Sequence, residues 1–120
     1  MRTEKITGAE LEIMRAVWDM GRPVSLSEIM EQLKAGANKK TVHTFLSRLV
    51  EKGVLSQQRQ EVYFYTPLVS RQQYERAKTA ELVNRVYRGD VKKLFSALTG
   101  GGNLPQEELD ELARYWEEVS

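Results

Sequence analysis

The sequence predicts a mainly α-helical fold that includes one small β-hairpin. Three observations support this prediction. Capping boxes mark three helix starts, apolar residues recur at helical spacing after each of them, and one segment rich in aromatic and β-branched residues is divided by a short polar tip. The 120 residues suit one domain, or a small domain with an appended region.

The first two helices and a later one begin at recognisable signals. A Ser or Thr followed three residues later by Glu or Gln occurs at residues 7–10, 25–28 and 70–73. Each pair can satisfy the free backbone N–H groups at a helix start. We expect the first helix to end at Gly21 and the second at residues 35–36, because glycine readily adopts the left-handed conformation that follows a helix.

A third helix should begin after Asn38, whose side chain can cap it, and end at Gly53. Its apolar residues follow the i, i+3, i+4, i+7, i+8 pattern of one buried helix face. They are Val42, Phe45, Leu46, Leu49 and Val50.

Residues 54–59 and 62–66 flank the polar tip 60–61 and are predicted to form a β-hairpin, with 23–24 as a short third strand. The aromatic run 63–65 could stack on single-stranded nucleic acid, but we expect these side chains to pack on the adjacent helices instead. After the hairpin, a helix over 70–88, a shorter helix capped by Asp90, three glycines at 100–102 and a final helix around 106–119 are predicted.

Three helices followed by a hairpin are the order of a winged helix-turn-helix domain. In such a domain the third helix enters the major groove of DNA and the hairpin, or wing, lies along the backbone. We place this DNA-binding domain at residues 1–69 and a helical dimerisation region at 70–120. A small helical domain with a hairpin of no such function is the alternative, since fold alone does not determine function.

The polar face of the third helix favours DNA binding over a merely solvated surface. It combines cations with short hydroxyl side chains, which reduce helix propensity but allow close approach to bases and phosphates. We expect Arg48 to contact a guanine or a phosphate, Lys39 and Lys40 to contact phosphate at the helix start, and Lys52 and the wing residue Arg59 to contact the backbone. The complete predicted DNA-binding set is Lys39, Lys40, Thr41, His43, Thr44, Ser47, Arg48, Lys52 and Arg59.

The net charge of +1 hides a strong asymmetry. Residues 36–60 hold five Lys and Arg against Glu51 alone, whereas residues 100–120 hold six carboxylates against Arg114 alone. This distribution indicates that only the middle of the chain meets a polyanion.

Other function classes find little support. There is no cysteine and His43 is the only histidine, so we expect no thiol chemistry, metal site or cofactor. His43 has no evident acidic partner and no serine-elbow motif is present, which argues against a hydrolase or any other enzyme. No apolar run approaches eighteen residues and the start lacks an apolar signal, so we expect a cytoplasmic protein without a membrane span. A protein-interaction adaptor is the main alternative function.

A symmetric dimer would let two recognition helices read two half-sites of one operator. The C-terminal helices have apolar stripes that a domain ending at residue 69 does not need for its own core, although these stripes could also fold back onto that domain. The predicted dimerisation residues are Tyr74, Val83, Val86, Tyr87, Leu94, Phe95, Leu98, Leu109, Leu112 and Trp116.

Several segments together resemble the penicillinase and methicillin-resistance repressor family. Residues 8–14 are similar to the family's opening Ser-Ala-Glu-Trp-Glu-Val-Met, and 40–53 are similar to its recognition-helix pattern with Lys-Thr, Arg-Leu and Lys-Gly. Residues 65–67 and 82–89 match as well, so the similarity runs nearly from end to end.

The resemblance implies a homodimeric repressor bound to an inverted-repeat operator in double-stranded DNA. It also implies a membrane sensor metalloprotease that triggers cleavage in the C-terminal region. The family's Asn-Phe cleavage pair matches Ala97 and Leu98, so this sequence departs from the family at the cut. The Cys-x-Cys tail of the family's copper-responsive branch is absent.

Overall fold

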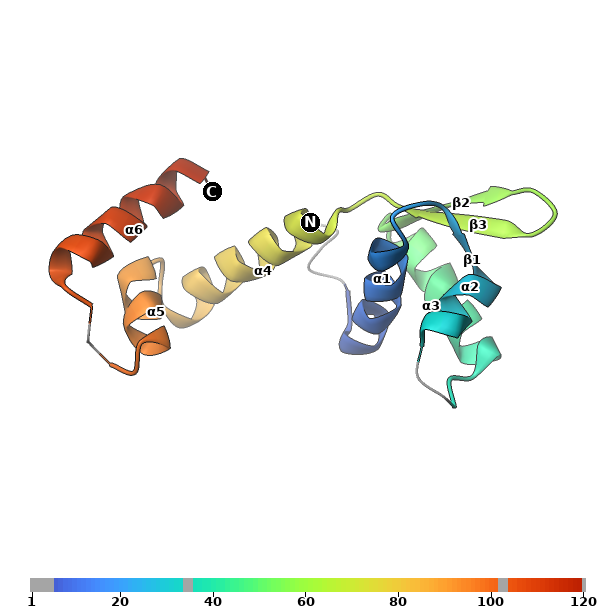
Figure 1. The fold of residues 1–120 in the computed structure, drawn as a ribbon, viewed down its shortest axis with the longest axis horizontal. Helices are drawn as coiled ribbons and strands as arrows, with labels where there is room; N and C mark the ends of the chain where they lie inside the picture. Colours follow the sequence, from blue (N-terminus) through green and yellow to red (C-terminus); the bar gives the residue numbers. More distant parts are fainter. Residues whose placement is uncertain (1–5, 34–35, 102–103, 120) are drawn as a thin grey trace. The chain divides into compact units, whose positions relative to one another are not determined.

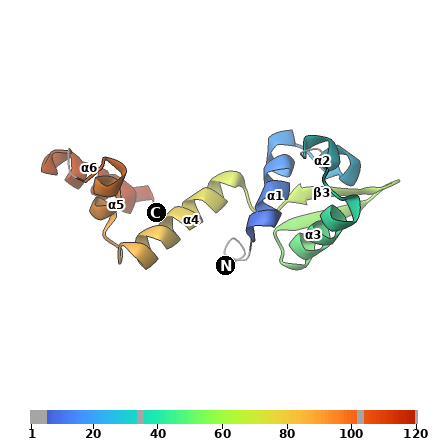
Figure 2. The same cartoon turned by 90° about the horizontal axis from the view of Figure 1, so that it is seen from below.

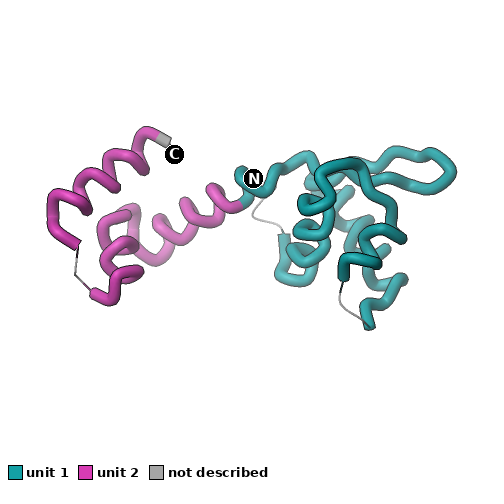
Figure 3. Tube along the Cα trace, viewed as in Figure 1, with its two compact units in different colours: residues 1–74 teal, residues 75–120 magenta. Residues whose placement is uncertain are grey.

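The computed structural model describes residues 6–33, 36–101 and 104–119. The chain forms two compact units, residues 1–74 and residues 75–120 (Figure 3). The predicted boundary after residue 69 therefore lies five residues before the division in the structure. No helix among the described residues is long and apolar enough to cross a membrane.

The first unit contains three helices and a three-stranded antiparallel sheet. Its elements are α1 (Gly8–Met20), β1 (Val24–Ser25), α2 (Leu26–Gln32), α3 (Lys39–Glu51), β2 (Leu55–Arg59) and β3 (Tyr63–Pro67). The strand order is β1-β3-β2, and Tyr65 of β3 faces Val24 on one side and Gln57 on the other. Figures 1 and 2 show the helices packed together and the β2–β3 hairpin extending beyond them. The predicted mainly helical fold with a wing is confirmed.

The predicted helix starts are confirmed in atomic detail. The Thr7 hydroxyl accepts from the Glu10 N–H at 3.2 Å while the Glu10 carboxylate accepts from the Thr7 N–H at 2.9 Å, and Ser25 forms the same box with Glu28. The α1 helix ends at Gly21, whose φ of 66° is the left-handed conformation expected there.

The second helix is shorter than predicted. It ends at Gln32 because Leu33 adopts an extended conformation with ψ of 159°, and the Leu33 side chain packs against the core. The predicted end at residues 35–36 is therefore wrong; Ala35 itself lies outside the described residues.

The core of the first unit joins the apolar faces of its helices to the inner face of the sheet. Its centre includes Met14, Ile29, Leu46, Leu49, Val54, Leu55 and Tyr65, all at most 2% exposed. The stripe predicted for the third helix supplies three buried side chains, Val42, Leu46 and Leu49. This packing fixes which side of α3 faces outward.

The helix α4 (Arg71–Val86) begins in the first unit, and its larger part belongs to the second, together with α5 (Val91–Leu98) and α6 (Gln106–Val119). Its start at Ser70 has the predicted capping contacts with Gln73, at 2.9 and 3.0 Å. The helix ends at Val86, before the predicted residue 88, and the Gly89 N–H closes its last turn on the Val83 carbonyl at 2.9 Å.

The second unit has a small core of its own. Val83, Val91 and Leu94 are buried together, and Tyr87, Phe95, Ala113 and Trp116 pack against them. Lys92 and Asp110 form an ion pair between α5 and α6. A single chain therefore buries part of the apolar surface of its C-terminal helices.

Candidate nucleic-acid interface

The exposed face of α3 presents the residues that the sequence predicted for DNA contact. All are exposed, whereas Val42, Leu46 and Leu49 of the same helix are buried. They are Lys39, Lys40, Thr41, His43, Thr44, Ser47 and Arg48. The face therefore combines cations with short hydrogen-bonding groups and lacks an exposed apolar anchor.

Local contacts orient several of these side chains. The Asn38 side chain accepts from the backbone N–H groups of Lys40 at 2.9 Å and Thr41 at 3.2 Å, so the helix start is capped within the chain. The Thr44 hydroxyl donates to the Lys40 carbonyl at 3.0 Å, which leaves its oxygen lone pair and its methyl group for an outside contact. The Arg48 guanidinium lies 5.8 Å from the ring centre of Phe45.

A groove of about 290 Å³ lies between α3 and the wing. It is lined by Ser25, Leu26, Ser27, Lys39, His43, Arg59, Glu61, Val62, Tyr63 and Tyr65, and we call it the wing groove. Cations from both sides, Lys39 on α3 and Arg59 on β2, face it, against one carboxylate from Glu61. Such a groove suits a phosphate backbone that passes between the recognition helix and the wing.

The aromatic residues of β3 only partly follow the prediction. Tyr65 is buried in the core as expected, but Tyr63 is 39% exposed and its ring lies under the Arg59 guanidinium, 5.1 Å from ring centre to guanidinium carbon. Arg59 and Tyr63 are also cross-strand partners in the β2–β3 ladder. The prediction that the whole aromatic run packs on the helices is therefore wrong for Tyr63, whose ring instead contacts the Arg59 guanidinium.

Lys52 does not stand on the exposed face with the other predicted contacts. Its ammonium nitrogen lies 2.6 Å from Oε1 of Glu10, a carboxylate that is only 1% exposed. Burial alone would raise the pKa of Glu10, but the hydrogen bonds from Lys52 and Thr7 outweigh it and hold this pKa below the usual value. The sequence prediction of a phosphate contact by Lys52 did not anticipate this buried partner.

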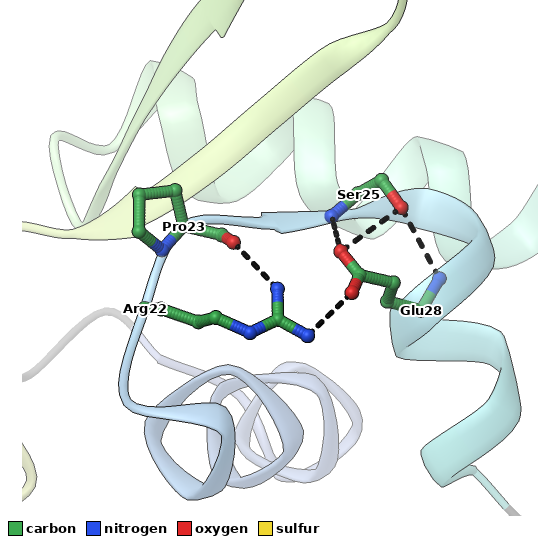
Figure 4. A network of polar contacts seen from close by, with 4 residues as sticks. All are labelled: Arg22, Pro23, Ser25 and Glu28. Carbon is green, nitrogen blue, oxygen red and sulfur yellow. Dashed lines mark hydrogen bonds and ion pairs between the residues drawn. The ribbon is translucent and has the colours of Figure 1, made fainter.

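A second polar cluster fixes the start of α2, which lines the wing groove (Figure 4). Arg22 donates to the Pro23 carbonyl at 3.1 Å and to the Glu28 carboxylate at 2.5 Å, while the Ser25 N–H donates to Glu28 at 3.1 Å. The hydrogen bond from Arg22, followed by that from the Ser25 backbone, lowers the pKa of Glu28 to about 2. The carboxylate therefore stays ionised at neutral pH.

The predicted dimerisation residues fall into two groups. Val83, Leu94 and Leu109 are buried within a single chain, and Tyr87, Phe95 and Trp116 are half-buried. Val86, Leu98 and Leu112 are exposed, by 63%, 73% and 36%, and so are Leu82 and Tyr115 of the same unit, which the predicted set does not include. The spacing of Leu82 four residues before Val86 could have identified it, since such residues share a helix face.

Tyr74 was predicted to contact a second chain but packs on the core of the first unit. Its ring centre lies 5.7 Å from that of Trp18, whose indole N–H donates to the Val69 carbonyl at 2.9 Å. The residues of the predicted cleavage pair, unlike Tyr74, do not pack on a core. Ala97 and Leu98 are both exposed and form the last turn of α5.

Among the described residues, no group of three or more His, Asp or Glu side chains is placed to hold a metal ion.

Comparison with known proteins relates this arrangement to one family. The family model described as penicillinase repressor matches residues 6–118. The penicillinase repressor of Bacillus licheniformis is 30% identical over 117 residues, covering 95% of this chain and 91% of that protein. The methicillin resistance regulatory protein MecI of Staphylococcus aureus (strain N315) is 28% identical over 114 residues, covering 92% of each.

Two solved structures resemble part of the chain. The DNA-binding domain of the repressor BlaI has a TM-score of 0.52 and 32% identity, covering 58% of this chain and 88% of that one. The Bacillus licheniformis BlaI monomer in complex with the blaP half-operator has a TM-score of 0.50, with the same identity and coverage. The capped helices, the wing and the match over residues 6–118 lead to one conclusion: this chain belongs to the penicillinase repressor family.

Proposed function

We propose that this protein is a sequence-specific DNA-binding transcriptional repressor that acts as a homodimer on an inverted-repeat operator. The observation that supports this most strongly is the exposed face of α3, where hydroxyl and cationic side chains stand opposite the buried stripe beside the wing groove. Relatives that are named repressors, one of them solved with a half-operator, support the same function.

The α3 helix enters the major groove of the operator in this proposal. Arg48 at its outer face contacts a guanine edge or a phosphate, and Ser47 contacts a base edge or the backbone. The methyl group of Thr44 is suited to a thymine methyl, since its hydroxyl hydrogen is already donated to the Lys40 carbonyl. These short side chains allow the helix to lie deep in the groove.

The phosphate backbone of one strand passes through the wing groove. Lys39 and Arg59 approach it from opposite sides, and the stacking of Arg59 on Tyr63 reduces the entropy lost when the guanidinium binds. These contacts raise affinity for any duplex and contribute no sequence information directly.

The homodimer forms through the exposed apolar side chains of the second unit, Leu82, Val86, Leu98, Leu112 and Tyr115. Their burial between two copies would remove from water the apolar surface that the unit's own core leaves uncovered. The buried residues Val83 and Leu94 support the helices that present this surface.

Proteolysis by a membrane sensor metalloprotease is the proposed route of release. A cut between Ala97 and Leu98 would separate α6 from α4 and α5, and with it Ala113 and Trp116 from the core around Val83. The exposure of both residues at the end of α5 favours access, whereas the sequence Ala-Leu in place of Asn-Phe requires a protease of altered preference. The protein would act in the cytoplasm and without catalysis of its own.

Selection from a random pool of duplexes tests the proposal. The full chain is incubated with the pool, bound DNA is recovered, and the enriched sequences are read. The proposal predicts an enriched inverted repeat whose half-sites are about one or more helical turns apart. Recovery of no preferred sequence would contradict sequence-specific binding, and recovery of a single unrepeated half-site would contradict the dimer.

A winged-helix adaptor that binds another protein through α3 is the alternative. Protein-binding surfaces concentrate aromatic and apolar anchors at their centre. The face that includes Thr44, Ser47 and Arg48 has none, which favours DNA.

A further inference from the structure

We propose that the ion pair between Glu10 and Lys52 positions the recognition helix for DNA binding, and that Lys52 itself makes no contact with DNA. The inference rests on the proposed function, because it assigns a role within the same interface. It replaces the simple expectation that a lysine at the end of a recognition helix contacts a phosphate.

The pair joins two helices at a buried point. Glu10 lies in the first turn of α1, and Lys52 caps the C-terminal end of α3, 42 residues later. The same oxygen, Oε1 of Glu10, accepts from the Lys52 ammonium at 2.6 Å and from the Thr7 N–H at 2.9 Å. The carboxylate is 1% exposed and the Lys52 side chain 25% exposed, so water competes little for this contact.

The place of the pair on α3 makes it relevant to DNA. Lys52 follows Arg48 by one helical turn, and the Lys52 N–H donates to the Arg48 carbonyl at 2.9 Å. The α3 helix has 13 residues and is therefore about 20 Å long. A shift at its C-terminal end consequently tilts the whole exposed face, Arg48 first, relative to the wing groove.

A carboxylate in this position has a cost for a DNA-binding protein. Glu10 adds negative charge within 2.6 Å of a recognition-helix lysine and neutralises a cation that could otherwise attract phosphate. Its burial also requires that the charge stay paired, because an unpaired buried charge is strongly unfavourable. A role in fixing α3 against α1 accounts for a pair that electrostatic attraction to DNA alone would not favour.

The two roles of Lys52 predict opposite results for the variant Glu10→Gln. If Lys52 is a phosphate contact, removal of the nearby negative charge strengthens DNA binding. If the pair positions α3, the neutral amide holds Lys52 less firmly and binding weakens. Glutamine retains the capping contact with Thr7, so the helix start is preserved.

The test measures affinity of the full chain for the duplex recovered by the selection above, over a range of salt concentrations. The variants are Glu10→Gln, Lys52→Met, and the double variant. The control is Glu12→Gln, which removes a negative charge of the same helix from an exposed ion pair with Arg15. Thermal unfolding followed by circular dichroism checks that each variant is folded at the binding temperature.

The proposal predicts a Kd about tenfold higher for Lys52→Met and a smaller rise for Glu10→Gln, with an unchanged dependence on salt. The double variant should bind about as weakly as Lys52→Met, because the pair that fixes α3 against α1 is absent from both. Glu12→Gln should bind like the parent or slightly tighter.

If the plot of log affinity against log salt concentration is shallower by about one for Lys52→Met, the proposal is overturned and Lys52 is a phosphate contact. Tighter binding by Glu10→Gln, or parental affinity for Lys52→Met, would overturn it as well. If the parent selects no duplex at all, the proposed function fails and not this assignment alone. If Lys52→Met does not fold, the Glu10→Gln variant alone separates the two roles: weaker DNA binding supports the positioning role, and tighter binding overturns it.

Discussion

Replacing Val86 by aspartate should convert the proposed homodimer into monomers while the second unit stays folded. Val86 ends α4 and is 63% exposed in a single chain, so little of its side chain serves the intrachain core. Full burial of a valine contributes about 2 kcal/mol, so covering the exposed part contributes about 1.3 kcal/mol per copy. In a two-fold symmetric contact this counts twice, and losing about 2.5 kcal/mol raises the dimer Kd about 70-fold. Burial of the aspartate charge adds to this value.

Sedimentation equilibrium over a series of protein concentrations measures this shift. Asn84→Asp is the matched control, because it introduces the same charge at an exposed position of the same helix. We expect Asn84→Asp to dimerise like the parent and both variants to retain the parental circular dichroism spectrum. Parental dimerisation of Val86→Asp would refute the assignment of the interface to the exposed apolar side chains. Equal loss of dimerisation in Val86→Asp and Asn84→Asp would show that any added negative charge on α4 weakens the dimer.

Three further predictions concern the first unit. Leu46→Ala should lower the free energy of unfolding by about 2–5 kcal/mol, because Leu46 is fully buried between α3 and the core; a loss below about 1 kcal/mol in urea titration would contradict the packing described. Arg22→Ala should raise the pKa of Glu28 from about 2 toward 4.5, as measured by carboxyl NMR titration, and an unchanged pKa would refute the role of Arg22. The contribution of this lowered pKa to stability is present above pH 4.5 and is lost as the pH falls toward 2. Arg59→Ala should weaken binding to every duplex alike and make the plot of log affinity against log salt concentration shallower by about one. Tyr63→Leu should lower the affinity less. A loss of affinity confined to one sequence would show that Arg59 reads bases.

Much of the first unit could be predicted from local signals. The boxes at Thr7 and Ser25, the cap at Asn38 and the glycine at position 21 each act through hydrogen bonds or backbone conformation within a few residues, so their spacing alone identifies them. The exposed face of α3 followed from its apolar stripe, because a regular helix converts spacing into direction.

Contacts between distant residues could not be predicted in this way. Nothing in the spacing of Lys52 indicates that Glu10 lies beside it, since the pair depends on how α1 packs against α3. Likewise Tyr74 stands at helical spacing with later apolar residues of α4, yet it packs on Trp18 of the first unit. The end of α2 was not predicted, because the extended conformation of Leu33 accompanies its packing on a core built from distant residues.

For the C-terminal helices, too, the sequence pattern alone does not identify the contact partner. Their apolar stripes predicted a buried surface, but a stripe does not indicate whether its own chain or a second copy covers it. The structure assigns Val83 and Leu94 to the chain's own core and leaves Val86 and Leu98 exposed. The buried set cannot form a contact with a partner without unfolding the unit.

Whether α3 reads DNA sequence can be measured as the ratio of two dissociation constants. Binding of the full chain is titrated against the selected duplex and against a scrambled duplex of equal length and composition at one salt concentration. We expect the scrambled duplex to bind with a Kd at least about 10³ times that of the selected duplex. Arg48→Ala should reduce the difference in binding free energy between the two duplexes by about 1–3 kcal/mol, whereas Arg15→Ala should leave this difference unchanged. Equal affinity for the two duplexes would contradict the claim.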